Sequence, residues 1–248
     1  STLCDTWPSR STRMRELIRT VTDRPVVKVV VTHYHADHIY GLQVYADEGA
    51  QVIAPGEALA YVNGPQAATR LAERRETLRP FIDERTRVVY PDVLVERDTT
   101  FTLGDYSFTL QPFGPVHSDG DLTMLVQPGG VLFSGDLIFE GRVPFVGDAD
   151  TRRWIEVLDG LLKGRLSALV PGHGAASRNP DATLSLTRDY LAFLRAVMGK
   201  AVEEMQSFDE AYAAVDWSRY RDLPAFEAAN RRNAYAVYLG LENESMGR

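Results

Sequence analysis

The densest group of potential metal ligands lies in residues 32–38, which read THYHADH. His33 and His35 follow a run of β-branched residues directly, and in an extended segment residues two apart face the same side. Asp37 and His38 come a turn later and can face a second point a few ångströms away. Imidazole and carboxylate are both ligands of divalent metals such as zinc. The spacing therefore predicts a metal site with two neighbouring positions, and a surface loop that is merely rich in histidine is the weaker interpretation.

Three further residues stand at similar places along the chain. His117 lies in a loop rich in Gly and Pro, Asp136 follows an apolar run, and His173 stands between two glycines. Taken alone, a loop histidine is usually solvated, and an aspartate at such a point is most often a helix N-cap. Together with the first segment they form a set at strand-to-loop junctions, where proteins of this kind build their sites. All five histidines of the chain belong to this set.

The order His-x-His-x-Asp-His, then His, Asp and His, resembles the metallo-β-lactamase superfamily. The resemblance covers residues 5–175 and implies an α+β fold, a four-layer αββα sandwich with a two-metal site at one edge. Residues 3–6 are similar to the first motif of that family, in which an aspartate, here Asp5, supports the metal loop. Strands precede this motif in the family, so we expect the natural chain to begin upstream.

The resemblance also implies roles for the seven residues. The first metal would be held by His33, His35 and His117, the second by Asp37, His38 and His173, with Asp136 bridging the two. The predicted function is that of a binuclear zinc hydrolase with two Zn²⁺ per chain. In such an enzyme a hydroxide between the metals attacks a small ester, thioester or amide. Asp37 and Asp136 are the predicted catalytic residues, because they would orient the hydroxide as well as bind metal.

Asp136 narrows the comparison within the superfamily. The β-lactamase branches carry Cys or Ser near the position of Asp136 in the motif, whereas glyoxalase-II-like hydrolases carry Asp. The resemblance therefore does not imply hydrolysis of antibiotics. Residues 135–150 and 226–234 are similar to bacterial zinc hydrolases encoded with sulfur-oxidation or quinoprotein systems, which are usually exported.

Other residues near the site have weaker predicted roles. Asp5, Asp119 and Asp121 are candidates to accept hydrogen bonds from the ligand imidazoles, although aspartates that merely form turns are an equal interpretation. Tyr34 and Arg142 are candidates for substrate binding, although core packing is the commoner role of an aromatic side chain.

Three alternative functions share the same motif. A persulfide dioxygenase-like oxidoreductase would hold one Fe²⁺ on His33, His117 and Asp136. A nuclease of the superfamily is disfavoured by the net charge of -7, since nucleic-acid binders normally present a basic face. A protein that binds metal without catalysis is disfavoured by the complete set of ligands.

The elements that must position these residues follow from the hydrophobic pattern. The resemblance implies an αββα domain over residues 1–180, and a helical extension packed on it is expected over residues 181–248. Strands are expected at 26–31, 51–54, 93–95, 100–103, 106–112, 122–126, 131–134 and 167–170. Helices are expected at 12–21, 39–49, 66–84, 154–162, 184–197, 208–215 and 225–241. The first strand is expected to be buried on both faces.

Composition limits the remaining possibilities. The 248 residues include one Cys, so no disulfide can form within the chain. No stretch reaches the roughly 18 apolar residues of a membrane helix. We therefore expect a small-molecule substrate and neither a membrane nor a nucleic acid as partner. The expected location is the periplasm if an upstream segment carries an export signal, and otherwise the cytoplasm. Nothing in the sequence predicts the oligomeric state.

Overall fold

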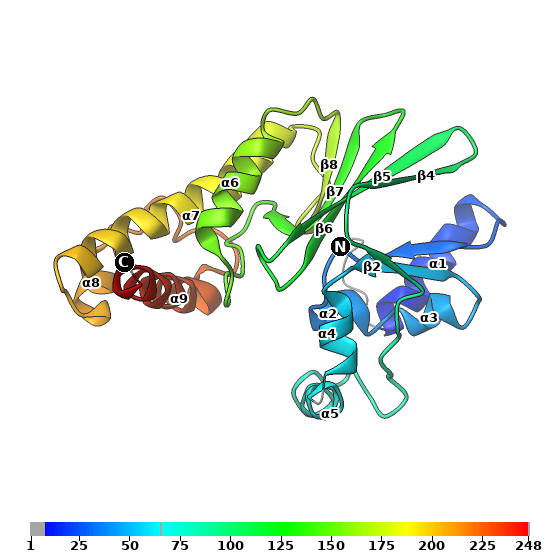
Figure 1. Ribbon diagram of the computed structural model, residues 1–248, viewed down its shortest axis with the longest axis horizontal. Helices are drawn as coiled ribbons and strands as arrows, with labels where there is room; N and C mark the ends of the chain where they lie inside the picture. The colour runs from blue at the N-terminus through cyan, green and yellow to red at the C-terminus, as the bar shows by residue number, and fades with distance from the viewer. Residues whose placement is uncertain (1–7, 65, 248) are drawn as a thin grey trace.

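The computed structural model describes residues 8–64 and 66–247, which fold as two facing β-sheets with helices on their outer sides (Figure 1). The first sheet has the order β1-β2-β3 and is parallel. The second has the order β4-β5-β6-β7-β8, antiparallel as far as β7 and parallel between β7 and β8. The strands are β1 (Lys28–Val30), β2 (Gln51–Pro55), β3 (Val93–Val95), β4 (Thr99–Leu103), β5 (Tyr106–Gly114), β6 (Asp121–Gln127), β7 (Val131–Phe139) and β8 (Ala168–His173).

Helices from the first part of the chain accompany the first sheet, and the later ones cover the second (Figure 1). The first group is α1 (Pro8–Val21), α2 (Ala36–Ile39), α3 (Gln43–Ala46), α4 (Ala58–Asn63) and α5 (Ala67–Thr77). The second group is α6 (Thr151–Leu161), α7 (Pro180–Glu203), α8 (Phe208–Ala214) and α9 (Phe226–Met246). The predicted αββα order is confirmed, and α8 and α9 lie outside it as the extra C-terminal helices.

Apolar side chains fill the spaces between these layers. Ile53 and Val95 of the first sheet meet Leu110 and Leu122 of the second. The cluster behind the second sheet unites β7 with α6, α7 and α9, and includes the fully buried Trp154. Burial of each such large side chain stabilises the fold by about 1.5–3 kcal/mol. Since α7 and α9 share a core with β7, the C-terminal helices pack directly on the αββα layers.

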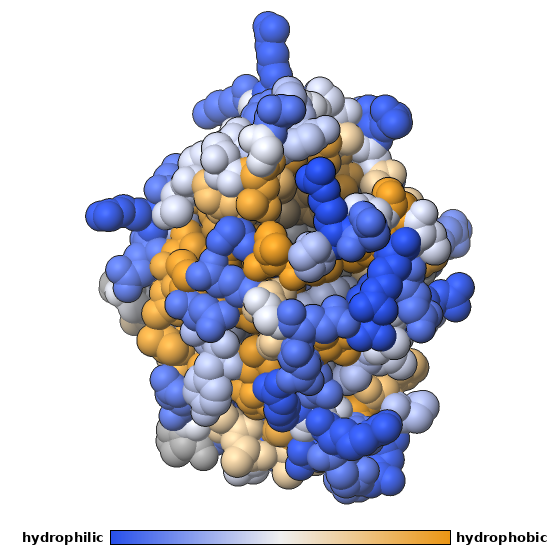
Figure 2. Space-filling model, turned by 90° about the vertical axis from the view of Figure 1, so that its right-hand side faces the viewer, coloured by the Kyte–Doolittle hydropathy of each residue, from blue (hydrophilic) through white to orange (hydrophobic). Residues whose placement is uncertain are grey.

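The first strand is shorter and more exposed than the sequence predicts. Only Lys28–Val30 form β1, all three are half-buried, and Val27 is exposed. The reason is that β1 pairs with β2 alone among the described residues, so it lies at the edge of the sheet there. Figure 2 shows this side of the molecule, where apolar surface alternates with hydrophilic side chains.

Two predicted helices also differ from the structure. The stretch 39–49 is not one helix, because α2 and α3 are separate short turns joined at Tyr40–Leu42. The stretch 66–84 is helical only to Thr77, and Arg79–Pro80 follows with a cis peptide bond. Proline removes a backbone donor and disfavours helix at the preceding residue, which explains the early end.

Candidate metal centre

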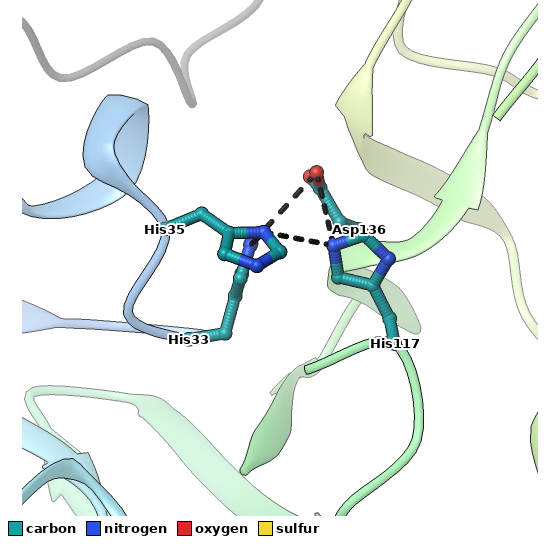
Figure 3. A group of neighbouring side chains, drawn as sticks. All are labelled: His33, His35, His117 and Asp136. Atoms are coloured by element: carbon teal, nitrogen blue, oxygen red, sulfur yellow. Dashed lines mark hydrogen bonds and ion pairs between the residues drawn. The ribbon is translucent and has the colours of Figure 1, made fainter. Parts of the chain in front are cut away.

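Four places in the fold supply the predicted ligands, and they meet at one edge of the two sheets. His33 and His35 lie in the loop after β1, and Asp37 and His38 lie in the first helix, α2, that follows this loop. The other three residues come from the second sheet: His117 from the loop after β5, Asp136 from β7 and His173 from the end of β8. Figure 3 shows His33, His35, His117 and Asp136 turned toward a common point.

The first group of donor atoms belongs to these four residues. His33 Nε2 lies 3.1 Å from His35 Nδ1, and His117 Nε2 lies 3.0 Å from the same atom. Asp136 Oδ2 is 3.8 Å from His33 Nε2 and 3.6 Å from His117 Nε2. Tetrahedral zinc with Zn–N bonds of about 2.0–2.1 Å requires ligand atoms roughly 3.3 Å apart. The spacing therefore fits one zinc-sized cation.

The second group consists of Asp37, His38 and His173. His173 Nε2 lies 3.1 Å from Asp37 Oδ2, and His38 Nε2 lies 3.5 Å from it. Asp136 also reaches this group, since its Oδ1 is 3.2 Å from His38 Nε2 and its Oδ2 is 3.3 Å from His173 Nε2. Asp136 thus stands between the two groups, the position that a bridging carboxylate requires.

The imidazoles of the first group are poor bases. Burial lowers the pKa of His117 to about 3 and lowers the pKa of His35. Burial, followed by the charge of His38, holds the pKa of His33 well below its usual value. Neutral imidazole is the form that binds metal, so these three residues are ready as ligands at neutral pH.

The second group behaves in the opposite way. Burial opposes protonation of His38, but the negative charges of Asp136 and Asp37 raise its pKa to about 10. Hydrogen bonds to the same carboxylates raise the pKa of His173 to about 9, again against the effect of burial. Burial likewise opposes ionisation of Asp37 and Asp136, yet the facing histidines hold both pKa values below the usual range. Without metal, the protons on His38 and His173 therefore supply the positive charge that a cation would supply at the second group.

Two buried atoms support this interpretation. His38 Nε2 and Asp136 Oδ1 are inaccessible to solvent, and neither has a partner in hydrogen-bond geometry within the described part of the chain. Leaving such groups unsatisfied is costly, and a metal between them would satisfy both. The donor chemistry, the spacing and these two atoms all fit a pair of divalent cations.

Close backbone packing holds Asp136 in place. Gly172 of β8 lies against it, and a Cβ atom at Gly172 would overlap Asp136 Oδ1. Gly135, with φ of +53°, packs against the side chain of Thr32, which leaves no room for a Cβ there. Thr32 in turn places its Oγ1 3.2 Å from His33 Nδ1, a support for the ring that the sequence did not suggest.

The three aspartates predicted to support the ligands differ in what the structure shows of them. Asp5 lies outside the described residues. Asp121 is buried and accepts hydrogen bonds from Ser118 N at 2.8 Å and Ser118 Oγ at 3.0 Å, so it braces the loop of His117 rather than its ring. Burial raises the pKa of Asp121 to about 7. Asp119 lines the cleft described next.

A cleft of about 660 Å³ opens above the donor groups. His35, Asp37, His117, Asp136 and His173 form part of its lining, and so does Tyr34, one of the two predicted substrate-binding residues. Arg142, the other, is not among the residues that line it. Phe145 also lines the cleft. Six further side chains on the wall are ones that sequence reasoning missed: Glu57, Tyr61, Arg74, Leu78, Asp148 and Asp150.

Comparison with known sequences finds one family model and several related proteins. The family model described as "Metallo-beta-lactamase superfamily" matches residues 7–173. The chain is 31% identical over 163 residues to "Acyl-coenzyme A thioesterase MBLAC2" of Gallus gallus, covering 60% of this chain and 57% of the relative. It is 29% identical over 174 residues to the Homo sapiens protein of that name, covering 64% and 60%. The chain thus spans less than two thirds of the length of these relatives.

Solved structures resemble the fold at lower sequence identity. The sec-alkylsulfatase Pisa1 from Pseudomonas sp. has a TM-score of 0.74 at 19% identity, over 96% of this chain and 44% of that one. A metallo-beta-lactamase from Pontibacter korlensis has a TM-score of 0.58 at 23% identity, over 77% and 81%. At these identities the likeness shows the shared fold alone. The structural match to Pisa1 extends over nearly the whole of this chain, including the C-terminal helices.

Proposed function

The chain belongs to the metallo-beta-lactamase superfamily, and from that premise we propose that it is a hydrolase that binds two zinc ions and cleaves small acyl substrates. The observation that carries the proposal is the pair of donor groups that share Asp136 at the base of an open cleft. A non-catalytic role would not require an accessible cleft above the ligands.

We assign the first ion to His33, His35 and His117 and the second to Asp37, His38 and His173, with Asp136 between them. Two bound ions would supply a water molecule that ionises near neutral pH and a Lewis acid for the substrate carbonyl oxygen. Asp37 and Asp136 hold the donor groups together and accept hydrogen bonds at the base of the cleft. Their carboxylates remain ionised because the facing histidines lower their pKa values.

Among acyl substrates, thioesters are the first class to test. The two vertebrate relatives are named as acyl-coenzyme A thioesterases, and about 30% identity supports a related leaving group here. Esters and amides remain in the proposal because the same chemistry at a carbonyl serves all three. The complete second donor group favours a two-zinc site over a single iron, which needs only two histidines and one carboxylate.

Metal analysis combined with a hydrolysis panel tests this proposal. The purified protein is analysed for zinc and iron and assayed on acyl thioesters, esters, lactones and β-lactams of matched acyl chain. We expect close to two zinc ions per chain and hydrolysis that is fastest for thioesters. One iron ion per chain, or no hydrolysis of any panel member by the zinc-loaded protein, would contradict it.

A further inference from the structure

One wall of the cleft is built from side chains that hold no metal. Tyr34 lies between two predicted ligands, and its ring centroid is 5.6 Å from that of Tyr61 on α4. Leu78, at the end of α5, lines the cleft as well. These three side chains give the cleft an apolar strip that leads away from the donor groups toward α5.

The aromatic part of this strip is held in place. The Arg70 guanidinium lies 3.9 Å from the Tyr61 ring centroid and donates a hydrogen bond to the Tyr61 carbonyl oxygen. Tyr34 is only 6% exposed, and its buried hydroxyl has no hydrogen-bond partner among the described residues. The Tyr34 side chain therefore offers the cleft mainly its apolar ring.

Charge is distributed unevenly around the cleft. Arg74 is the one Lys or Arg side chain among the described residues that line it. Its guanidinium makes no hydrogen bond or ion pair with another described residue, whereas its neighbours Arg70 and Arg75 are both bonded to backbone carbonyls. Apart from the donor residues Asp37 and Asp136, four acidic side chains occupy other parts of the lining: Glu57, Asp119, Asp148 and Asp150.

We propose, building on the hydrolase function above, that Arg74 selects acyl substrates that carry an anionic group, a carboxylate or phosphate, beyond an apolar segment. The apolar segment would lie along Tyr34, Tyr61 and Leu78, and the anion would pair with the guanidinium, whose planar fork matches both oxyanions. The acidic side chains elsewhere in the cleft repel the anion, so they favour a single orientation of the substrate.

Paired substrates test this selection. The zinc-loaded enzyme is assayed on monothioesters of dicarboxylic acids of increasing length, on their methyl-ester-capped neutral counterparts, and on acyl thioesters that end in phosphate. We expect one anionic series to be preferred at its best length. Arg74→Gln should lower kcat/KM for that series by about tenfold to 100-fold, the usual loss for a charged hydrogen bond. Its activity on neutral counterparts should stay within about twofold, and Arg74→Lys should restore part of the preference.

Two controls separate selection from other effects. Arg79→Gln removes the same charge next to α5 but outside the cleft lining, so it should leave the anionic preference intact. Calorimetric binding of adipate and hexanoate gives a readout without turnover. Adipate should bind the wild type more tightly, and the difference should vanish in Arg74→Gln.

The two proposals can fail separately. If the enzyme hydrolyses neutral and anionic substrates equally, and Arg74→Gln changes neither kcat/KM nor adipate binding, the role of Arg74 is wrong while the hydrolase function stands. If no panel member is hydrolysed, the hydrolase function fails. The binding of the two carboxylates still decides whether Arg74 recognises an anion.

Discussion

At the scale of single residues, Asp136 is the side chain on which both donor groups depend. Its two oxygens face His38 on one side and His33, His117 and His173 on the other. We therefore expect Asp136→Ala to lower the metal content below two ions per chain. Hydrolysis should fall by more than about 100-fold, because even residues that only support a ligand account for 10–100-fold.

The measurement is elemental analysis together with kcat/KM on the best thioester. Asp105→Ala removes an exposed carboxylate from the turn between β4 and β5, and this matched control should leave both readouts unchanged. Full activity in Asp136→Ala with two bound ions would show that the bridging assignment is wrong.

The protonation of the second donor group leads to a prediction about pH. In the metal-free protein at pH 7.5, His38 and His173 are protonated, because their pKa values are raised to about 10 and about 9. A metal that binds there must displace those protons, so its affinity should rise with pH, by about tenfold per unit for each proton released. The first metal faces imidazoles with lowered pKa values and should release few protons.

Calorimetric titration of the metal-free protein with Zn²⁺ in buffers of different ionisation enthalpy counts the protons released at each step. Proton release confined to the first equivalent, or a second-step affinity that does not change between pH 6.5 and 8.5, would argue against this assignment.

At the scale of elements, α9 holds the loop between β7 and α6. Asn233 of α9 is buried, accepts a hydrogen bond from Val146 N at 3.0 Å and donates one to the Pro144 carbonyl oxygen at 2.7 Å. Phe145 between them lines the cleft, and its ring centroid lies 6.1 Å from that of His35. The C-terminal helices therefore position part of the cleft although they supply no metal ligand among the described residues.

We expect Asn233→Ala to destabilise the protein by about 1–3 kcal/mol, because it leaves buried backbone groups without partners. KM should rise as Phe145 loses its fixed position, while the zinc content stays unchanged. Denaturant unfolding and steady-state kinetics measure these effects. Asn243→Ala, at an exposed position of the same helix, should change stability by less than about 0.5 kcal/mol. Equal effects of the two substitutions would contradict the claim that α9 positions the cleft wall through Asn233.

At the scale of the whole molecule, the proposed ligands come from segments that belong to both sheets. One loop and one short helix after β1 supply four of them, and β5, β7 and β8 or their loops supply the rest. Bound metal would therefore link the two layers that Ile53, Val95, Leu110 and Leu122 already pack together. Because metal binds the folded state, it should stabilise the sandwich against unfolding.

Thermal unfolding with and without a chelator tests this prediction. Free zinc at about 1,000 times its Kd stabilises by about 4 kcal/mol, which corresponds to a Tm difference on the order of 10 °C for a chain of this size. Restoration of the Tm by added Zn²⁺ is the control for damage by the chelator. If the Tm is the same with and without metal, the prediction that bound metal stabilises the folded sandwich is wrong.

The sequence by itself determined the order of most elements and singled out seven residues that the structure brings together. Its five histidines stand at or shortly after the ends of predicted strands, and the structure brings them together, since the turn chemistry and short strand runs around them are local properties. The change of hydrophobic period along the chain indicated only sheets flanked by helices, and the resemblance carried by the ligand residues implied the αββα layers.

Only the tertiary structure decided which strands share a sheet and what surrounds the metal centre. Val93–Val95 looks in sequence like the start of the later strand run, yet it pairs in parallel with β2 in the first sheet. Asp136 was expected after its strand, but β7 continues past it to Phe139, with register shifts where it pairs with β8.

Arg74 shows the same limit at the cleft. The helical pattern of 66–84 predicts a charged face turned to solvent; Arg74 on that face is exposed, and it also borders the cleft. The helical periodicity of a sequence shows that one face of a helix is polar. The residues that this face contacts are distant in sequence. Those contacts depend on how the layers pack, and for that reason they can be determined only in the folded molecule.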